Sequence, residues 1–289
     1  MIEWVVELNL YQYMKIWAHT LFKNEERWLW FSVTSVIDYV DKVLLWDTGS
    51  TDNSWKIAQA LKEKYKDKID LKQYGSVTPE TFPKVRQEML DATKSDWFII
   101  VDADEIWWKD SIAKLVDEIK KADSRTESFV VKNYNLVGDI YHYFDNSAGK
   151  YRFGSLVGNY ALRAIKRNIK GLVSQGRHGI WGWSDGEKHI QDRNSYKVID
   201  VVYIHTTFLP RGESRQDDIN VPKRAKKLKY EIGNEFELDF YYPEAFFTER
   251  PDFIPSPWIK MSTWYKLRAY IETPLKKLKR RFANEKVGY

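Results

Sequence analysis

The sequence predicts an α/β fold with a mostly parallel central sheet flanked by helices. Two observations indicate it. Short apolar runs typical of buried strands alternate, as far as about residue 122, with segments that have apolar residues at helical spacing, as in βαβ units. Two of the strand-like runs also end in acidic turns, WDTGSTD and VDADE, where open α/β sheets bind ligands.

The first part of the chain contains four predicted strand–helix pairs. The strands are apolar runs at 14–22, 42–47, 69–74 and 96–104. The helices follow them at 24–40, 49–65, 79–94 and 110–122. Asn24 is the expected N-cap of the first helix, because Glu25 and Glu26 then lie in its first turn.

The remainder is of mixed character. Strand-like runs at 128–137, 159–167 and 197–208 are separated by long loops that contain Gly, Asp and Asn. Residues 241–258 form a Pro- and aromatic-rich connector, and the last residues read as a basic helix. We therefore expect a mixed second half and a C-terminal helical extension.

Composition limits the possible classes of protein. With 289 residues, 43% hydrophobic and 30% charged, the chain can bury a sizeable core. The 13 Trp are enough to supply both a core and stacking surfaces. The absence of Cys excludes disulfides, thiolate metal sites and cysteine nucleophiles. No basic residue occurs in the first ten, so no secretion signal is expected, and no apolar run approaches ~20 residues.

The acidic turns suggest a cation site. Asp47 closes the second strand, and Asp102 and Asp104 close the fourth. Because side chains alternate along a strand, Asp102 and Asp104 are expected to point the same way, where their charges repel unless a cation lies between them. Oxygen ligands suit Mg²⁺ or Mn²⁺. The alternative is that both carboxylates merely cap the loop that follows.

The two turns, about 55 residues apart, resemble motifs of the family 2 glycosyltransferases of GT-A fold. WDTGSTD is similar to that family's DDGSTD-like turn, and DAD to its D-x-D. The DTGSTD and DADE forms together look like the branch that builds lipopolysaccharide cores and surface glycans. The resemblance is close over 14–110 and weak over 111–207. It implies metal-dependent, inverting sugar transfer from a nucleotide-diphosphate donor to a glycan or lipid-linked acceptor.

The resemblance also implies roles for particular residues. Thr20 and Arg86 would lie near the nucleotide, and Asp47 would accept hydrogen bonds from the base or ribose. Asp102 would contact ribose or metal-bound water, or the metal itself. Asp104 would ligate an Mn²⁺ or Mg²⁺ ion. Two departures are Thr48, where the family has a second acid, and Gln87, where the branch has Asn.

His205, downstream of the D-x-D, is a candidate third metal ligand, although a lone His at a strand end is often a core residue. Arg211 and Arg215, just beyond it, could reach a diphosphate or simply be solvated.

SQGRHGIWGWSDGEKH, residues 174–189, is the candidate acceptor segment. His178, Trp181 and Trp183 offer a ring nitrogen and flat faces for stacking on a sugar. Asp185 is the first candidate for the catalytic base and Glu187 the second, because an inverting transfer needs a carboxylate to take the acceptor's proton. The alternative is an ordinary surface loop with a partly buried Trp pair.

The C-terminal part carries the basic excess. Residues 258–289 contain nine Lys or Arg against two Glu in a chain of net charge +5, so the rest is slightly acidic. Apolar residues recur at spacings of three or four along 264–282. This pattern suits an anionic membrane surface, or a helix packed on the body or on a second subunit, and no base-reading motif favours nucleic acid.

Three regions are expected: a nucleotide-sugar-binding half at 1–125, an acceptor-binding half of the same domain at 126–215, and a C-terminal basic helical extension at 216–289. The expected location is cytoplasmic, with possible peripheral contact through 258–282 to the inner face of a membrane. Two alternatives to a transferase are a sugar-nucleotide pyrophosphorylase-like nucleotidyltransferase and a non-catalytic carbohydrate-binding protein.

Overall fold

The structure is a computed structural model, and it describes residues 14–149, 151–177, 181–212, 227, 229–282 and 286–287. The first half contains, in order, β1 (Ile16–Phe22), α1 (Leu29–Val36), β2 (Lys42–Asp47), α2 (Ser54–Tyr65), η1 (Lys66–Lys68), β3 (Ile69–Gln73), α3 (Phe82–Ala92), β4 (Trp97–Ile100), β5 (Glu105–Trp107) and α4 (Lys109–Lys120). The second half contains β6 (Ser128–Val137), β7 (Asp139–Tyr143), η2 (Asn146–Ala148), β8 (Tyr151–Phe153), β9 (Leu156–Gly158), β10 (Tyr160–Lys166), β11 (Val173–Gln175), β12 (Gly182–Ser184), η3 (Ile190–Asp192), β13 (Tyr196–Phe208), β14 (Asn234–Glu235), η4 (Glu244–Phe247), α6 (Thr263–Arg281) and β15 (Lys286–Val287).

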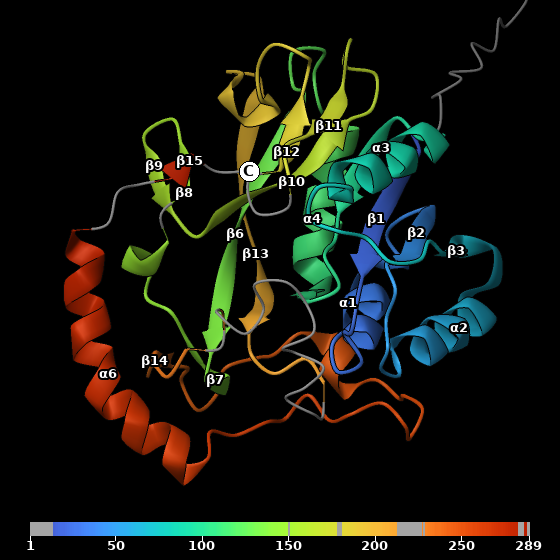
Figure 1. Cartoon of the computed structure of the whole chain (residues 1–289). Helices are drawn as coiled ribbons and strands as arrows, with labels where there is room; N and C mark the ends of the chain where they lie inside the picture. The colour runs from blue at the N-terminus through green and yellow to red at the C-terminus, as the bar shows by residue number, and fades with distance from the viewer. Residues whose placement is uncertain are drawn as a thin grey trace, which may run out of the picture.

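One mixed sheet forms the centre of the molecule, with strand order β14-β7-β6-β10-β4-β1-β2-β3 (Figure 1). β1 to β4 are parallel, whereas β10 is antiparallel to both β4 and β6. β13 runs parallel to β6 and antiparallel to β5. The predicted α/β class, with a parallel first half and a mixed second half, is confirmed.

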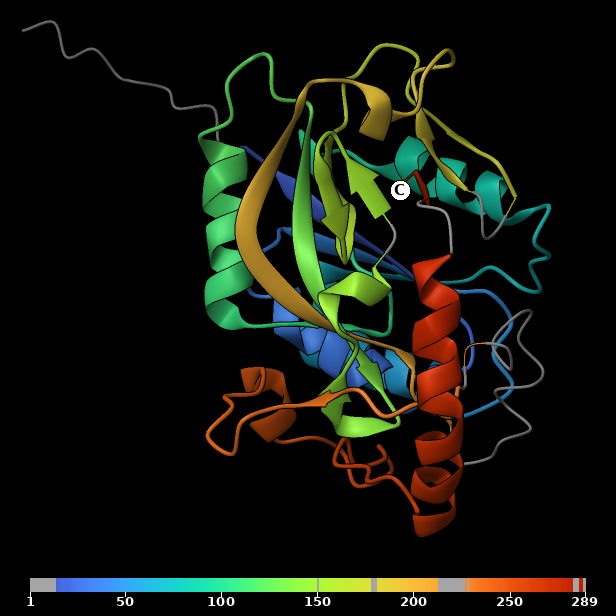
Figure 2. The ribbon, with the colours of Figure 1, turned by 90° about the vertical axis from the view of Figure 1, so that its left-hand side faces the viewer.

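Side-chain alternation explains how the helices cover the sheet. On β2, Val43 and Leu45 face the cluster that contains α1, α2 and α4, while Leu44 and Trp46 face the cluster that contains α3. Figure 2 shows α4, in green, and α3, in teal, on opposite sides of the strands. Both faces are therefore buried, which accounts for the nearly continuous apolar runs of these strands.

Several predicted boundaries differ from the structure, and two of them lie at the edge of the sheet that carries the acidic turns. The first helix begins at Leu29, not at Asn24, because Asn24 has a φ of 53° and bonds across to the next turn. Its backbone N–H donates to Ser50 Oγ at 3.0 Å, and its Oδ1 accepts from Thr51 N at 2.7 Å. The fourth strand ends at Ile100, before the acids.

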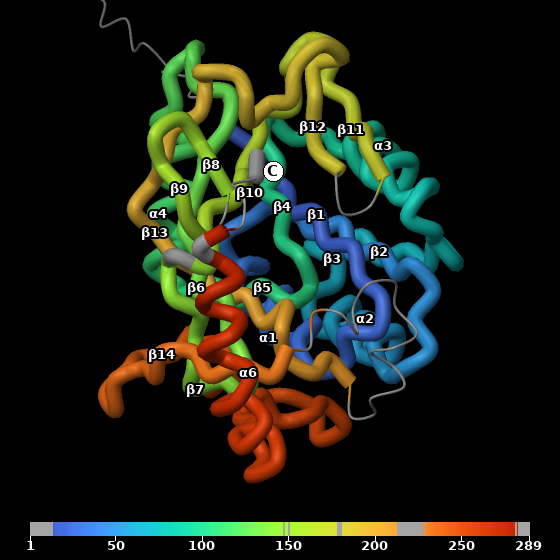
Figure 3. Tube along the Cα trace, turned by 60° about the vertical axis from the view of Figure 1, so that its left-hand side comes forward, coloured from blue at the N-terminus to red at the C-terminus, as the bar shows by residue number. Residues whose placement is uncertain are grey.

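The C-terminal helix α6 begins after Ser262, whose hydroxyl accepts from Tyr265 N at 3.1 Å, and it continues through Pro274. Figures 1 and 3 place it near β7 and β14, far from β3. Within the described part of the chain, no helix is long and apolar enough to cross a membrane. The region boundaries at 125 and 215 stay predictions, although β10 and β6 extend the first region's sheet into the second.

A buried histidine links the folding stability to pH. His19 on β1 is fully buried, stacks on Phe98 with centroids 4.5 Å apart, and has its Nε2 2.7 Å from Thr93 Oγ1. The Thr93 hydroxyl donates to Met89 O, so it accepts from His19 Nε2–H, and the ring is neutral. Burial, with the nearby Arg86 charge, holds the pKa of His19 well below its usual value.

We expect His19 to contribute a fall in the free energy of unfolding as the pH drops from about 7 to about 5, because below about 6.5 the unfolded His19 binds a proton that the folded one does not. Each such group contributes a slope of up to about 1.4 kcal/mol per pH unit. His19→Gln should reduce the change in unfolding free energy with pH, measured by urea denaturation at several pH values. The difference between the two proteins isolates His19, because His205 contributes a slope of the same sign in both and Glu105, with a pKa of about 8, a slope of opposite sign in both. Equal slopes for both proteins would contradict this account.

Candidate active site

The acidic turn, residues 101–105, lies between β4 and β5. Glu105 N donates to Asp102 O at 2.9 Å, which closes the turn. β5 then pairs with β13, so that Glu105 lies opposite His205. Thr206 N donates to Asp104 O at 2.9 Å. The backbone of the turn is thus held by β13, the strand that carries the predicted third metal ligand, His205.

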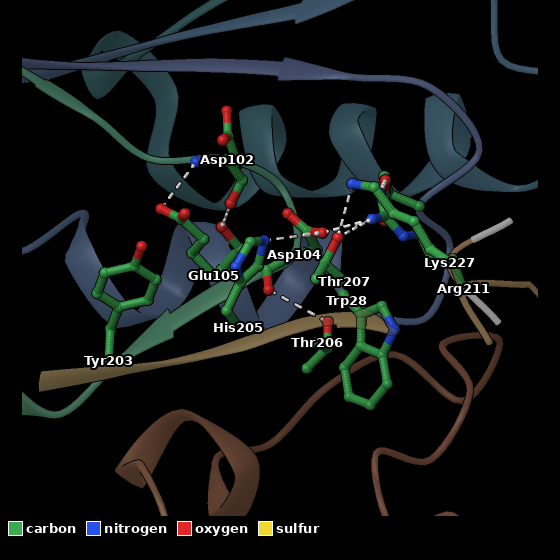
Figure 4. Close-up of polar contacts among 12 residues, drawn as sticks. Trp28, Asp102, Asp104, Glu105, Tyr203, His205, Thr206, Thr207, Arg211 and Lys227 are labelled. Carbon is green, nitrogen blue, oxygen red and sulfur yellow. Dashed lines mark hydrogen bonds and ion pairs between the residues drawn. The ribbon is translucent and has the colours of Figure 1, made fainter. Parts of the chain in front are cut away.

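Asp104 lies at the centre of the site (Figure 4). Its Oδ2 is 2.6 Å from Arg211 Nη2 and 3.4 Å from His205 Nε2. The side chain is almost fully buried, and burial alone would raise its pKa. The charges of Arg211 and Lys227, with the hydrogen bond from His205, outweigh burial and hold the pKa of Asp104 well below its usual value. The carboxylate is therefore charged at neutral pH, as a metal ligand must be.

Asp102 points away from the Asp104–His205 pair (Figure 4), which corrects the expectation that the two carboxylates share a direction. Strand alternation does not extend to them because β4 ends at Ile100. The Asp102 side chain, 26% exposed, accepts from Arg86 Nη2 at 2.7 Å and lies 3.9 Å from Arg163 Nη2. Burial would raise the pKa of Asp102, but Arg86 and Arg163 lower it below the usual value.

Glu105 is a member of the site that the sequence reasoning missed. It is fully buried and forms an ion pair with Arg163, whose Nε also donates to Tyr203 Oη at 3.1 Å. Its Oε2 accepts from Asp102 N at 3.3 Å. Burial raises the pKa of Glu105 to about 8, despite Arg163. The sequence feature that marks Glu105 is its position at the end of DADE, where it begins the buried strand β5.

A second group of residues brings the β1–α1 loop to the acidic turn. Arg211 forms an ion pair with Glu25, and Arg27 N donates to Arg211 O at 2.9 Å. Thr207 Oγ1 accepts from Arg211 Nη2 at 3.0 Å and from Lys227 Nζ at 2.8 Å. Two cationic groups therefore lie on one side of Asp104. Arg211 had been noted in the sequence, and Arg215 lies outside the described residues.

The residues predicted to meet the nucleotide are more enclosed than expected. Asp47 is fully buried, and it accepts from Ser50 N at 3.0 Å and from Ser50 Oγ at 2.6 Å. Thr20 is fully buried inside β1, not at its end. Arg86 is 3% exposed, with its guanidinium over the rings of Phe82 and Trp181. In this structure Asp47 shapes its own turn, and Arg86 orients Asp102.

The predicted acceptor segment is packed rather than open. Trp181 and Trp183 are 1% and 2% exposed, and their rings contact each other, Phe82 and Phe98 edge to face. The expectation of two open stacking faces is therefore wrong, because β11 and β12 pack this segment against α3 and the sheet. His178 lies outside the described residues.

Asp185 and Glu187 are not near the acidic turn. Asp185 accepts from Glu187 N and Lys188 N within its own turn and forms an ion pair with Arg193. The backbone hydrogen bonds, together with Arg193, lower the pKa of Asp185 to about 2.

The Arg193 guanidinium also binds the Glu127 side chain. The carbonyl oxygen of Glu127 accepts a hydrogen bond from Lys166 N, and Lys166 lies opposite Trp97 at the amino end of β4. The acids 102–105 follow the carboxyl end of that strand. Glu187 is exposed and lies in the same turn as Asp185. The first choice of base, Asp185, is therefore placed wrongly for chemistry at the acidic turn.

The fold and the site together define an α/β protein with charged groups gathered beyond the carboxyl ends of parallel strands, which is a GT-A-like architecture. A family comparison agrees: residues 19–179 match the model of glycosyl transferase family 2. This protein belongs to that enzyme family. A comparison with curated protein sequences found no match.

Solved structures with a similar fold include S. aureus TarS 1-349, with 13% identity over 67% of this chain and a TM-score of 0.43. TarS 1-349 in complex with UDP matches with 14% identity over 74% of this chain and 68% of the other, with a TM-score of 0.44. Mycobacterium tuberculosis glucosyl-3-phosphoglycerate synthase in complex with Mn²⁺ and UDP-glucose has 16% identity over 67% and 71% of the two chains, with a TM-score of 0.40. The match spans 61% of TarS 1-349.

The buried ion pair yields a stability prediction. At about pH 9, where the Glu105 carboxyl is ionised, Arg163→Met should lower the free energy of unfolding by about 3–5 kcal/mol, because it leaves Glu105 buried without its partner charge. The double variant with Glu105→Gln should recover much of that loss, because no buried charge remains unpaired. Urea denaturation measures both. A single-variant loss below about 1 kcal/mol would show that the pair is not desolvated.

The position of Asp185 yields a prediction about the rate of sugar transfer. Asp185→Asn should change the rate of sugar transfer by less than about threefold, whereas loss of a general base costs roughly 100-fold or more. Steady-state kinetics on the purified enzyme decide this, with Glu187→Gln as the matched control in the same turn. A loss of 100-fold would restore Asp185 as the base.

Proposed function

We propose that the protein transfers a sugar from a nucleoside-diphosphate donor to a glycan or lipid-linked acceptor, with the donor diphosphate at the acidic turn. The observation that supports this most directly is the charge arrangement of the turn in a family 2 chain. Arg211 and Lys227 lie beside Asp104, and a diphosphate that entered there would meet both cationic groups. The partly exposed Asp102 is the most accessible carboxylate of the turn.

A divalent cation, Mn²⁺ or Mg²⁺, is part of the proposal, and the donor atoms present support it. Asp104 Oδ2 and His205 Nε2 are 3.4 Å apart. Two ligands at right angles, each about 2.1 Å from a metal, lie about 3 Å apart, so the pair has the right spacing. Burial lowers the pKa of His205, although Asp104 opposes this, so the imidazole is available as a neutral ligand.

The fit is partial. Within the residues that the structure describes, no three His, Asp or Glu side chains converge to hold a metal. Asp102, the third predicted ligand, is bound by Arg86, and Arg211 shares the Asp104 carboxylate. We infer that Asp104 and His205 hold the cation, with its other positions filled by water and by donor phosphate oxygens. Asp102 contributes negative charge nearby.

The roles of the chain's own residues follow from these contacts. A bound cation neutralises charge on the departing diphosphate. Arg211 and Lys227 lie next to that position and stabilise the same charge by direct hydrogen bonds. Glu105 and Arg163 are positioning residues, because they clamp the backbone of the turn from the buried side. The base that takes the acceptor proton, and with it inversion, stays a prediction without an assigned residue.

The DTGSTD and DADE motifs favour a place in the branch that builds lipopolysaccharide cores and surface glycans, acting at the inner, cytoplasmic face of a membrane. Such acceptors are large and amphiphilic. They agree with a site at a sheet edge better than with a closed pocket.

Nucleotide binding tests the proposal. Thermal melting with UDP, GDP or dTDP should show stabilisation by one diphosphate that requires Mn²⁺ or Mg²⁺ and is lost with EDTA. Asp104→Asn should abolish this metal dependence and lower kcat/KM for transfer by about 100-fold or more. Asp200→Asn, at an exposed position outside the site, is the control.

Other outcomes point elsewhere. A response only to a nucleoside triphosphate with a sugar phosphate would indicate a nucleotidyltransferase. Indifference to every nucleotide would indicate a carbohydrate-binding protein. An Asp104→Asn variant with wild-type transfer would refute the ligand assignment.

A further inference from the structure

The C-terminal helix α6 packs on the body through its polar side. Tyr265 Oη donates to Lys229 O at 2.5 Å, and Lys276 Nζ donates to Tyr230 O at 2.8 Å. Thr273 Oγ1 accepts from Ile232 N at 2.9 Å. Arg280 forms an ion pair with Glu231 at 2.5 Å, and Ala269 is fully buried between these contacts. Hydrogen bonds, ion pairs and the ring contact between Tyr265 and Tyr230 therefore hold this helix.

The apolar side of α6 faces solvent. Six large apolar side chains on it are between 52% and 81% exposed: Trp264, Leu267, Ile271, Leu275, Leu278 and Phe282. At 3.6 residues per turn they fall within an arc of about 80°, roughly opposite the side that contacts the body. An amphipathic helix normally turns its apolar side inward. Here the orientation is reversed, along one continuous stripe far larger than scattered surface apolar residues produce.

The charges beside the stripe identify what covers it. Lys277 and Lys279 lie on its two sides and are exposed, and Lys266 is exposed as well. A second copy packed stripe to stripe would bring these like charges together, which disfavours self-association. An anionic bilayer surface attracts them, and their long side chains reach phosphates while the stripe enters the apolar layer. The aromatic rings of Trp264 and Phe282 suit the interface.

We propose that α6 is a membrane-binding element that lies in the surface of an anionic lipid bilayer, apolar stripe inward, with the protein body held on its polar side. This attachment does not depend on the proposed sugar transfer. The attachment goes beyond the proposed sugar transfer, because it orients the whole sheet relative to the lipid surface. The helix sits at the β7 and β14 end of the sheet (Figures 1 and 3), so this end faces the membrane.

Vesicle flotation without nucleotide or metal tests the proposal on the full chain. The wild-type protein should float with vesicles of equal parts phosphatidylglycerol and phosphatidylcholine, and bind phosphatidylcholine vesicles at least tenfold more weakly. Ile271→Glu with Leu275→Glu should reduce binding to the anionic vesicles at least tenfold. The matched control is Val157→Glu with Val198→Glu, which makes the same charge change at exposed apolar positions outside α6 and away from β14.

The control pair should bind like the wild type, and both double variants should keep the wild-type circular dichroism and melting temperature, because all four positions are exposed. Equal binding by the Ile271/Leu275 variant and the wild type would overturn the proposal. So would absence of vesicle binding together with a wild-type dimer, in light scattering, that this variant disrupts. A chain that binds vesicles but transfers no sugar would refute the proposed function and leave this inference standing.

Discussion

The packing of three carboxylates into four consecutive positions is the constraint on which the site depends. Asp102, Asp104 and Glu105 lie close together in a largely buried turn, and each carboxyl group pairs with a different arginine. Arg86 comes from α3, Arg163 from β10, and Arg211 from the segment after β13. Because a buried charge without a partner costs several kcal/mol, these three parts of the chain must meet at the turn.

Local patterns predicted the elements better than the site. The strand and helix periods gave the α/β class and most element positions, because burial on two faces leaves continuous apolar runs such as KVLLWD. They did not predict that β4 ends at Ile100, which decides the direction of Asp102. The partners of the turn were also missed, since Arg163 and Glu25 pair with residues 58 and 186 positions away, and nothing local marks them.

The segment around Trp181 and Trp183 and the helix α6 show a similar limit. Glycines around Trp181 and Trp183 indicate an open loop, yet the segment folds as a hairpin whose indoles join the core. Along α6 the spacing identified the apolar stripe correctly. Which side contacts the body was not readable, because the contacts on the polar side are made with backbone groups of residues 229–232, and these have no sequence signature.

The long separation of β5 from β13 has a consequence for biosynthesis. The backbone of Asp104 is held by Thr206, 102 positions later, and Arg211 follows still further on. While the ribosome is still making the intervening segment, the first strands can pair, but their acids have neither a supporting strand nor a full set of counter-charges. The edge of the sheet that carries the acidic turn can thus be completed only after the second half of the chain has been synthesised.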